Sequence, residues 1–501
     1  MIENPVANKT MEGKEADSFI KEVLKDFWIC CLSREASLLA RKDVLTGKGK
    51  FGITGDGKEV PQVAMARAFK NGDHRSGYYR DQTFMFALGL STVEAFFAQL
   101  YADAENDPFS GGRQMNSHFA TPYLDEKGDF TNQKDLKNIS AGISSTGGQM
   151  ARGFGLALSS KLYRNNPTLN NSTPYSDNGN EVSFLTIGDA STSEGVFWES
   201  INAACVMQVP MAVSVWDDGY GISVPIKYQT TKQSISKALK GFEFEEGEGM
   251  DIYVVNGWDY PALCQMYEEG IEKVRRTHTP ALFHVNELTQ PQGHSTSGSH
   301  ERYKSKDRLE WEREHDCIKV MRKWIIDTNL STEEEVAELE KNAKSYAKEC
   351  RDRAWADYME PATNAKNELA AIYQEIISAI PHNTKAQSLH QKFEKLMSPL
   401  WYEIVKSAQQ LQFALVKENT PLKEKLSNWI EAQKAIADTR YHTNLYSEGA
   451  LSALKVPVVP PTYSEDSSVK TGFNVLNTYF DKLFERDERV YAYGELSLIH
   501  I

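Results

Sequence analysis

The pattern of hydrophobic positions predicts strands that alternate with helices in the middle of the chain. Four short apolar, β-rich runs have the length of buried strands, and longer segments between them repeat apolar residues at helical spacing. The strands are expected at 182–187, 211–216, 252–255 and 281–286, and the helices between them at 193–206 and 261–274. This alternation predicts an α/β fold, with a central parallel sheet flanked by helices.

Helical patterns also occur on both sides of this region. Apolar residues between 19 and 39 repeat at helical spacing and predict one long amphipathic helix or two, and residues 150–162 form a helix rich in small side chains. Beyond Leu309 the chain turns into charged amphipathic helices, where Ser331 and Glu334 have the spacing of a capping box. A C-terminal helical arm of roughly a hundred residues is therefore expected.

These changes in pattern divide the chain into four parts. Residues 15–325 are expected to form the α/β domain and residues 326–455 the helical arm. Residues 456–471 contain the run VPVVPP and read as a linker. Residues 472–501 begin a further unit, with a helix at 473–484 and a strand at 490–493, but they are too few to build a core.

Charge and composition narrow the class of protein. The chain has 501 residues and a net charge of −13, which argues against non-specific binding to nucleic acid or to anionic membranes. No apolar run reaches the roughly 20 residues of a membrane span. The six cysteines show neither metal-ligand spacing nor a secreted disulfide framework, and the N-terminus has no apolar signal region. We therefore expect a cytoplasmic protein.

Two acidic positions follow neighbouring strands of the predicted sheet. Asp189 comes directly after the first strand, and Asp217 and Asp218 follow the second. Ligands of open parallel sheets bind beyond the carboxyl ends of the strands, so Asp189 and Asp218 are expected to be neighbours. Two carboxylates and a main-chain carbonyl suit magnesium, which also takes oxygens from water and phosphate. The alternative is that Asp217 and Asp218 only cap a turn.

Three loops carry further candidate chemistry. Arg80 stands before an apolar run and could clamp a phosphate, although such an arginine is often only a solvated charge. His118 ends a flexible polar stretch, where a histidine is usually an exposed side chain without a function. The loop 290–305 holds His294 among small residues, which is typical of a mobile active-site loop or of plain surface. The glycine-rich segment 47–57 is assigned no chemistry.

The acidic stretch resembles the thiamine-diphosphate signature, which is Gly-Asp-Gly followed after some two dozen residues by Asn-Asn. Here Gly188, Asp189 and Ala190 precede a gap that ends at Asp217 and Asp218. The chain departs from the signature twice, with Ala190 in place of the last glycine and Asp218 in place of the metal-binding asparagine. An aspartate can still bind magnesium, but it adds a negative charge beside a diphosphate.

The assembled motifs resemble the decarboxylating first component of the 2-oxoacid dehydrogenase complexes, most of all the branched-chain (2-oxoisovalerate) type. The resemblance covers residues 15–325 as a thiamine-diphosphate-binding α part. Residues 473–495 look like the opening of the pyrimidine-binding β part, so the order suggests a fused α and β chain that is cut short. The sequence motifs GRQM and GHSTS favour the branched-chain type over the pyruvate type.

The resemblance implies roles for individual residues. The cofactor-binding positions are Tyr79, Arg80, Ser144, Thr146, Gly188, Asp189, Ala190, Ser191, Asp218, Tyr220 and His294. Magnesium would be held by Asp189, Asp218 and the carbonyl of Tyr220. The catalytic positions are His118, His294 and Glu495, the last of which would activate the aminopyrimidine ring from the β part.

The activity that the resemblance implies is oxidative decarboxylation of a branched-chain 2-oxoacid, with acyl transfer to the lipoyl group of an acyltransferase component. Thiamine diphosphate and magnesium would be the cofactors. A β-type subunit or domain would be required for activity, and a homo-oligomer is expected. The alternatives are a pyruvate dehydrogenase first component, a transketolase-like enzyme and a non-catalytic α fragment.

Overall fold

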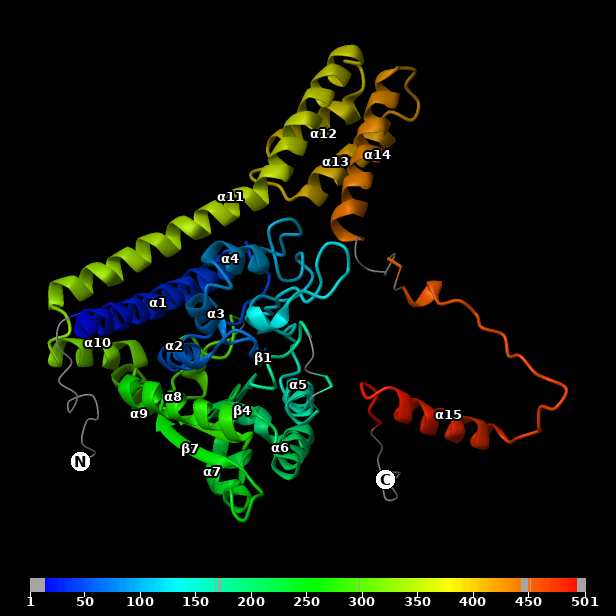
Figure 1. Ribbon diagram of the computed structural model, residues 1–501. Coiled ribbons are helices and arrows are strands. Elements are labelled where there is room, and N and C mark those ends of the chain that lie inside the picture. The colour runs from blue at the N-terminus through cyan, green and yellow to red at the C-terminus, as the bar shows by residue number, and fades with distance from the viewer. Residues whose placement is uncertain are drawn as a thin grey trace.

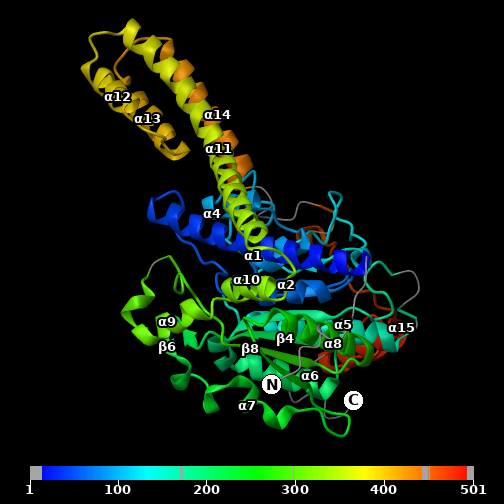
Figure 2. The same cartoon turned by 90° about the vertical axis from the view of Figure 1, so that its left-hand side faces the viewer.

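A computed structural model describes residues 14–492 of the chain, apart from 167, 170–172, 297, 443–448 and 451. It consists of an α/β body from which a long arm of helices projects, as Figures 1 and 2 show. None of the helices in the described ranges combines the length and the apolar character that crossing a bilayer requires. The predicted fold class, a central parallel sheet flanked by helices, is confirmed.

The sheet within the described residues has six strands in the order β2-β1-β3-β4-β8-β7, and every neighbouring pair is parallel. The strands are β1 (His74–Ser76), β2 (Asn138–Ile139), β3 (Ser183–Gly188), β4 (Met211–Trp216), β7 (Asp251–Asn256) and β8 (Ala281–Asn286). Four of them match the predicted strands within one residue at each end. The short strands β1 and β2 were not predicted, because two or three residues carry no readable period.

Alternate residues of the central strands face opposite sides of the sheet, as the pleat of a strand requires. Phe184 of β3 and Phe283 of β8 point into one hydrophobic cluster, whereas Leu185 and Leu282 point into another. Apolar residues on both faces are typical of a parallel sheet that is covered by helices on both sides. The continuous apolar runs in the sequence have this physical cause.

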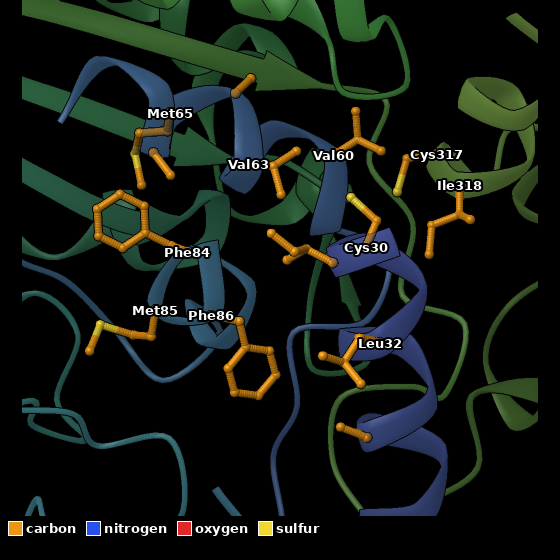
Figure 3. Packing of buried hydrophobic residues seen from close by; sticks show 14 of the residues in the cluster. Cys30, Leu32, Val60, Val63, Met65, Phe84, Met85, Phe86, Cys317 and Ile318 are labelled. Atoms are coloured by element: carbon orange, nitrogen blue, oxygen red, sulfur yellow. The ribbon is translucent and has the colours of Figure 1, made fainter. Parts of the chain in front are cut away.

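The face of the sheet that carries Phe184 and Phe283 is covered by a layer of helices. These are α1 (Lys14–Leu45), α2 (Glu59–Ala68), α3 (Gln82–Leu88), α4 (Val93–Tyr101), α8 (Tyr260–Thr277) and α10 (Cys317–Asp327). Figure 3 shows side chains of α1, α2, α3 and α10 meeting in this cluster, with Cys30, Val60 and Cys317 among them. The sequence left open one N-terminal helix or two, and α1 is a single helix.

The second face is covered by α5 (Gly148–Asn165), α6 (Gly195–Met207) and the short α7 (Ile235–Ala238). Close packing of α5 on the sheet explains its small residues. A Cβ added at Gly153 would lie 2.5 Å from the side chain of Leu185 on β3, so only glycine fits there. Helix α9 (Lys306–Glu314) follows β8 and lies near the edge where the strands end (Figure 2).

The helical arm has a hydrophobic core of its own. It is formed by the second half of α11 (Glu333–Ala379), together with α12 (Thr384–Glu394), α13 (Trp401–Ala414) and α14 (Leu422–Tyr441). Helix α11 spans about 70 Å at the usual rise per residue. Its first half packs along α1 and belongs to the core of the body (Figure 1). One continuous helix therefore serves two cores.

The capping box at the start of α11 lies one residue later than predicted. The reciprocal pair is Thr332 and Glu335, and Ser331 donates to the same Glu335 carboxylate over 2.6 Å. Adjacent serine and threonine followed by three glutamates offer two equivalent registers to a sequence pattern. The predicted pair of Ser331 and Glu334 was therefore wrong by one position.

The last described helix, α15 (Gly472–Arg486), is amphipathic but buries none of its residues. It follows the exposed segment 456–471, and Figure 1 shows it at the end of an extended stretch of chain. The strand predicted at 490–493 is not formed by residues 490–492, which have no neighbouring strand to pair with, and Tyr493 lies outside the described residues. The division of the chain into four domains stays a prediction.

Candidate active site

A polar cavity of about 340 Å³ lies at the edge of the sheet where β3 and β4 end. Gly188, the last residue of β3, pairs with Trp216, the last residue of β4, so the segments that follow them leave the sheet side by side. Asp189 begins a 3₁₀ turn, Asp189–Ser193, and Asp218 follows β4. Both residues line the cavity, as the order of the strands predicted.

Most of the predicted cofactor-binding residues line this same cavity. They are Tyr79, Arg80, Gly188, Asp189, Ala190, Ser191, Asp218, Tyr220 and His294. Ser144 and Thr146 lie outside its lining, but Thr146 donates a hydrogen bond of 2.6 Å to Ser191. Glu495 lies outside the described residues. Residues that the sequence reasoning missed complete the walls, among them Tyr78, Glu194, Gln290, Tyr303 and Lys304.

Asp189 is an unusual carboxylate because it is buried without full hydrogen bonding. Asp189 is only 3% exposed, and its Oδ2 atom has no hydrogen-bond partner among the residues that the structure describes. Burial, together with the negative charges of Asp218 and Asp217, raises the pKa of Asp189 well above its usual range. A buried carboxylate oxygen without a donor is an electrostatic cost, which a cation bound at this oxygen would relieve.

Asp217 and Asp218 are adjacent but differ in their contacts. Asp217 accepts a hydrogen bond from the main-chain N–H of Gly219 over 2.9 Å and bonds to Nε2 of His284 over 2.8 Å. The ring of His284 bonds in turn to Ser236. Oδ1 of Asp218 likewise accepts the main-chain N–H of Tyr220 over 3.2 Å, so both aspartates cap the turn, as the alternative interpretation held, and Asp218 also lines the cavity.

Lys58 is the partner of Asp218 and was not predicted from the sequence. Its residue is 1% exposed, and its Nζ lies 2.9 Å from Oδ2 of Asp218, 2.7 Å from Oε1 of Gln290 and 3.0 Å from the carbonyl of Thr289. Burial opposes ionisation of Asp218, but the charge and the hydrogen bond of Lys58, together with the charges of Lys304 and Arg80, outweigh it, so the pKa of Asp218 is lowered. Lys58 thus keeps Asp218 ionised.

Arg80 and His294 both line the cavity and are hydrogen-bonded to each other. Nη2 of Arg80 donates to Nδ1 of His294 over 3.0 Å and to its carbonyl over 2.9 Å, and Nη1 donates to the carbonyl of Thr54. Burial and the charge of Arg80 lower the pKa of His294 to about 4. Because a guanidinium only donates, Nδ1 accepts, and the neutral ring carries its proton on Nε2.

His118 lies outside the lining of this cavity and pairs with Ser144. Its Nε2 is 3.0 Å from Oγ of Ser144, and its Nδ1 is 3.1 Å from the carbonyl of Asn116. A carbonyl only accepts, so Nδ1 carries the proton and Nε2 accepts from the serine hydroxyl. Burial lowers the pKa of His118, which leaves the ring neutral near pH 7. The structure thus brings together two of the predicted residues, His118 and Ser144.

The loop after β8 is tied to the glycine-rich segment 47–57. Thr296 donates its N–H to the carbonyl of Gly52 and accepts the N–H of Gly52, each over 3.0 Å. Arg41 of α1 donates to the carbonyl of Gln292 over 2.5 Å. The segment to which no chemistry was assigned therefore supports the loop that carries His294.

Tyr303 and Lys304, which precede α9, line the cavity, and Arg308 of α9 braces it from behind. Arg308 donates to the carbonyl of Asp218 over 2.8 Å and to Glu312 over 2.9 Å. Lys304 lines the cavity and donates to Glu312 over 2.7 Å, and its ammonium lies 5.1 Å from the centre of the Tyr220 ring. These cations give the cavity the charge that suits a phosphorylated ligand.

The site fits a magnesium-bound diphosphate in its donor set. Asp189 offers an unpaired carboxylate oxygen, and the cavity walls supply Arg80, Lys304 and the N–H of the 3₁₀ turn after β3. The residues described include no group of three or more histidine, cysteine or acidic side chains that could hold a metal ion by themselves. A parallel α/β sheet with this edge defines a thiamine-diphosphate-binding fold.

Comparison with known proteins places the chain within that class. The dehydrogenase E1 component family matches residues 34–363, about two thirds of the chain, and the protein belongs to this family. The family consists of thiamine-diphosphate-dependent 2-oxoacid dehydrogenases, which are oxidoreductases, and this chain corresponds to their α component.

Three relatives illustrate the similarity. The 2-oxoisovalerate dehydrogenase subunit alpha of Bacillus subtilis is 26% identical over 291 residues, which cover 58% of this chain and 77% of that protein. The mitochondrial 2-oxoisovalerate dehydrogenase subunit alpha 1 of Arabidopsis thaliana is 25% identical over 68% of this chain and 64% of its own length. The pyruvate dehydrogenase E1 component subunit alpha of Rhizobium meliloti is 27% identical over 60% and 76%.

Proposed function

We propose that the chain binds thiamine diphosphate with magnesium in the cavity at the ends of β3 and β4 and oxidatively decarboxylates a branched-chain 2-oxoacid. The observation that carries this proposal is that Asp189 and Asp218 line one cavity at the sheet edge, where Oδ2 of Asp189 has no hydrogen-bond partner in the described part of the chain. Asp189, Asp218 and the carbonyl of Tyr220 are the proposed ligands of magnesium. Gly188, Ala190 and Ser191 would then lie along the diphosphate.

When bound, thiamine diphosphate would supply the nucleophilic carbon and the electron sink that decarboxylation of a 2-oxoacid requires. The protein supplies orientation, charge and proton transfer. Tyr79 and Arg80 hold the diphosphate end, and Arg80 also fixes the ring of His294. His294, with its proton on Nε2, donates a hydrogen bond into the cavity rather than removing a proton.

His118 is the proposed group that accepts a proton. Its Nε2 carries a lone pair held against the hydroxyl of Ser144, and the carbonyl of Asn116 fixes the tautomer from the other side of the ring. Ser144 and Thr146 are proposed to contact the aminopyrimidine side. Thr146 is joined to the diphosphate turn through Ser191.

The branched-chain substrate is supported by the two 2-oxoisovalerate relatives and by the GRQM and GHSTS wording of the sequence. The pyruvate enzyme is the second candidate, because the Rhizobium meliloti relative is equally similar. A ketone flanked by a branched chain differs from pyruvate by apolar groups, for which a pocket discriminates by about 10-fold to 200-fold for each methylene. A ratio of kcat/KM values therefore separates these candidates.

The proposed partners are a β-type part and a lipoyl acyltransferase. Helix α15 presents Phe473, Leu476, Phe480 and Phe484 to solvent, and such an apolar face favours packing against a further folded unit. The β part is proposed to cover this face and to bring Glu495 to the aminopyrimidine ring. A homo-oligomer of the resulting unit is also proposed.

The test is to combine the chain with a complete β part from a relative and to measure carbon dioxide release from 2-oxoisovalerate and from pyruvate. The proposal expects activity that requires magnesium and thiamine diphosphate and is higher on 2-oxoisovalerate. A preference for pyruvate would identify the second candidate. Cofactor binding with ketol transfer and without decarboxylation would identify a transketolase-like enzyme, and absence of cofactor binding would identify a non-catalytic fragment.

A further inference from the structure

The ammonium of Lys58 is enclosed by protein oxygens on all sides. Its three donors are taken up by Asp218, Gln290 and the carbonyl of Thr289. No donor is left for a ligand, so Lys58 cannot bind a diphosphate directly. Whatever Lys58 contributes to the cavity must act through its charge and through its contact with Asp218.

The position of Lys58 is unfavourable on local grounds. It is the N-cap residue of α2, where the helix dipole disfavours a cation, and its side chain makes no capping hydrogen bond. It is also almost fully buried, and a buried ammonium requires a partner. The ion pair with Asp218, 160 residues away in the chain, is what compensates for both.

Three aspartates at the strand ends differ in how their charges are compensated. Asp217 is occupied by the turn and by His284, and Asp218 is matched by Lys58. Asp189 alone remains without a cation. The thiamine-diphosphate signature has an uncharged asparagine where this chain has Asp218, and Lys58 and Asp218 together carry the same net charge as that asparagine.

We propose that Lys58 is a positioning residue that neutralises Asp218, so that Asp189 is the one uncompensated aspartate that the strand ends present to a magnesium-bound diphosphate. This inference rests on the proposed function and explains how an aspartate is accommodated at this position. Without Lys58, two uncompensated carboxylates would face a ligand that is itself an anion. The ammonium also holds Oδ2 of Asp218 at 2.9 Å from the side chain that begins α2.

The experiment is a double-mutant cycle on the full chain, read by calorimetric titration of thiamine diphosphate in saturating magnesium. Lys58→Met should weaken binding by about 10-fold to 100-fold, which is the usual cost of losing a group that supports a metal ligand. The second change, Asp218→Asn, removes the uncompensated charge. Lys58→Met/Asp218→Asn should therefore bind within about 3-fold of the wild-type protein.

Lys304→Met is the matched control. Lys304 is also buried and lies at the same cavity, but its hydrogen bond goes to Glu312, so it acts on Asp218 through its charge alone. Its loss should also weaken binding, but Asp218→Asn should not rescue it. Rescue of both lysine variants would show a general charge effect and would overturn the specific role of Lys58, and so would rescue of neither.

The cycle also separates this inference from the proposed function. If the wild-type protein does not bind thiamine diphosphate, the proposed function fails. If the wild-type protein binds with magnesium and Lys58→Met binds equally well, the inference alone fails. If Lys58→Met does not fold, as its unfolding transition will tell, the double variant decides, because it must still bind like the wild-type protein.

Discussion

His118 and His294 carry their protons on opposite ring nitrogens. The carbonyl of Asn116 requires the proton of His118 on Nδ1, whereas the guanidinium of Arg80 requires the proton of His294 on Nε2. Both rings have lowered pKa values and are neutral near pH 7. One histidine is therefore built to accept a proton at Nε2 and the other to donate a hydrogen bond from it.

This difference predicts different kinetic defects for the two histidines in the reconstituted enzyme. His118→Phe should lower kcat by about 10²-fold to 10⁴-fold, since a proton acceptor is lost, and should leave the affinity for thiamine diphosphate nearly unchanged. His294→Phe should weaken cofactor binding, because Arg80 loses an acceptor. Steady-state kinetics with calorimetric titration will check both, and equal defects in kcat and affinity for the two variants would contradict the assignment.

Asp189→Asn should stabilise the protein without cofactor and abolish magnesium-dependent cofactor binding. The asparagine has nearly the same shape, but it removes a buried charge whose Oδ2 atom has no donor. We expect a higher unfolding temperature by differential scanning calorimetry and a loss of at least about 100-fold in affinity for thiamine diphosphate. A lower unfolding temperature would mean that the carboxylate serves the fold instead.

Arg80→Lys should release the loop that carries His294. Arg80 makes three hydrogen bonds in a fixed fork, and an ammonium cannot reproduce that geometry. Limited proteolysis should show faster cleavage within residues 291–300 and calorimetry should show weaker cofactor binding. Arg41→Lys is the control, because Arg41 holds the same loop through Gln292 from outside the cavity. It should increase cleavage with a much smaller change in affinity.

Two buried histidines remote from the cavity predict loss of stability in acid. Burial lowers the pKa of His74 and of His278 to about 4 from an ordinary value of 6.5. Between these values the unfolded chain binds more protons than the folded protein, so the free energy of unfolding falls as the pH falls from 6.5 to 4. Each histidine should contribute a slope of up to about 1.4 kcal/mol for each pH unit.

Denaturant titrations at several pH values will measure this slope. His74→Gln and His278→Asn should flatten it, and asparagine suits the left-handed backbone of position 278, where φ is 60°. His442→Gln should leave it unchanged, because that side chain is 69% exposed. An unaltered slope in both buried variants would show that other groups control acid stability.

The strands and the acidic edge could be predicted because their signals are local. Buried runs such as 211–216 and 281–286 lie between helical patterns, and Asp189 and Asp218 follow them directly. Lys58 could not be predicted in this way. Its partners lie 160, 231 and 232 residues away, and a lysine after Gly57 has no pattern of its own. The signal that pointed to it was indirect: Asp218, a charged residue at an uncharged position of the motif, requires a cation.

The grouping of the histidines could not be predicted for a related reason. His118 and His294 were both expected to be catalytic, and the sequence did not show that their hydrogen bonds go to different neighbours, Ser144 and Arg80. A loop histidine shows its tautomer only through the atoms around it. Segment 47–57 is a similar case. Its glycines are typical of an ordinary turn, and only the hydrogen bond between Gly52 and Thr296 shows that the segment holds the loop of His294.

The helical arm departs from the α/β body and returns to the surface of that body at nearly the same place. Met359 and Pro361 of α11, where the chain departs, share a small cavity with Arg440 and Tyr441 of α14, where it returns, and Arg440 is anchored to Glu105 over 2.7 Å. The excursion between them has its own core and crosses no strand of the sheet. The arm is therefore an insertion whose two ends lie close together. Its length can change by whole helical turns without moving the point at which the chain continues.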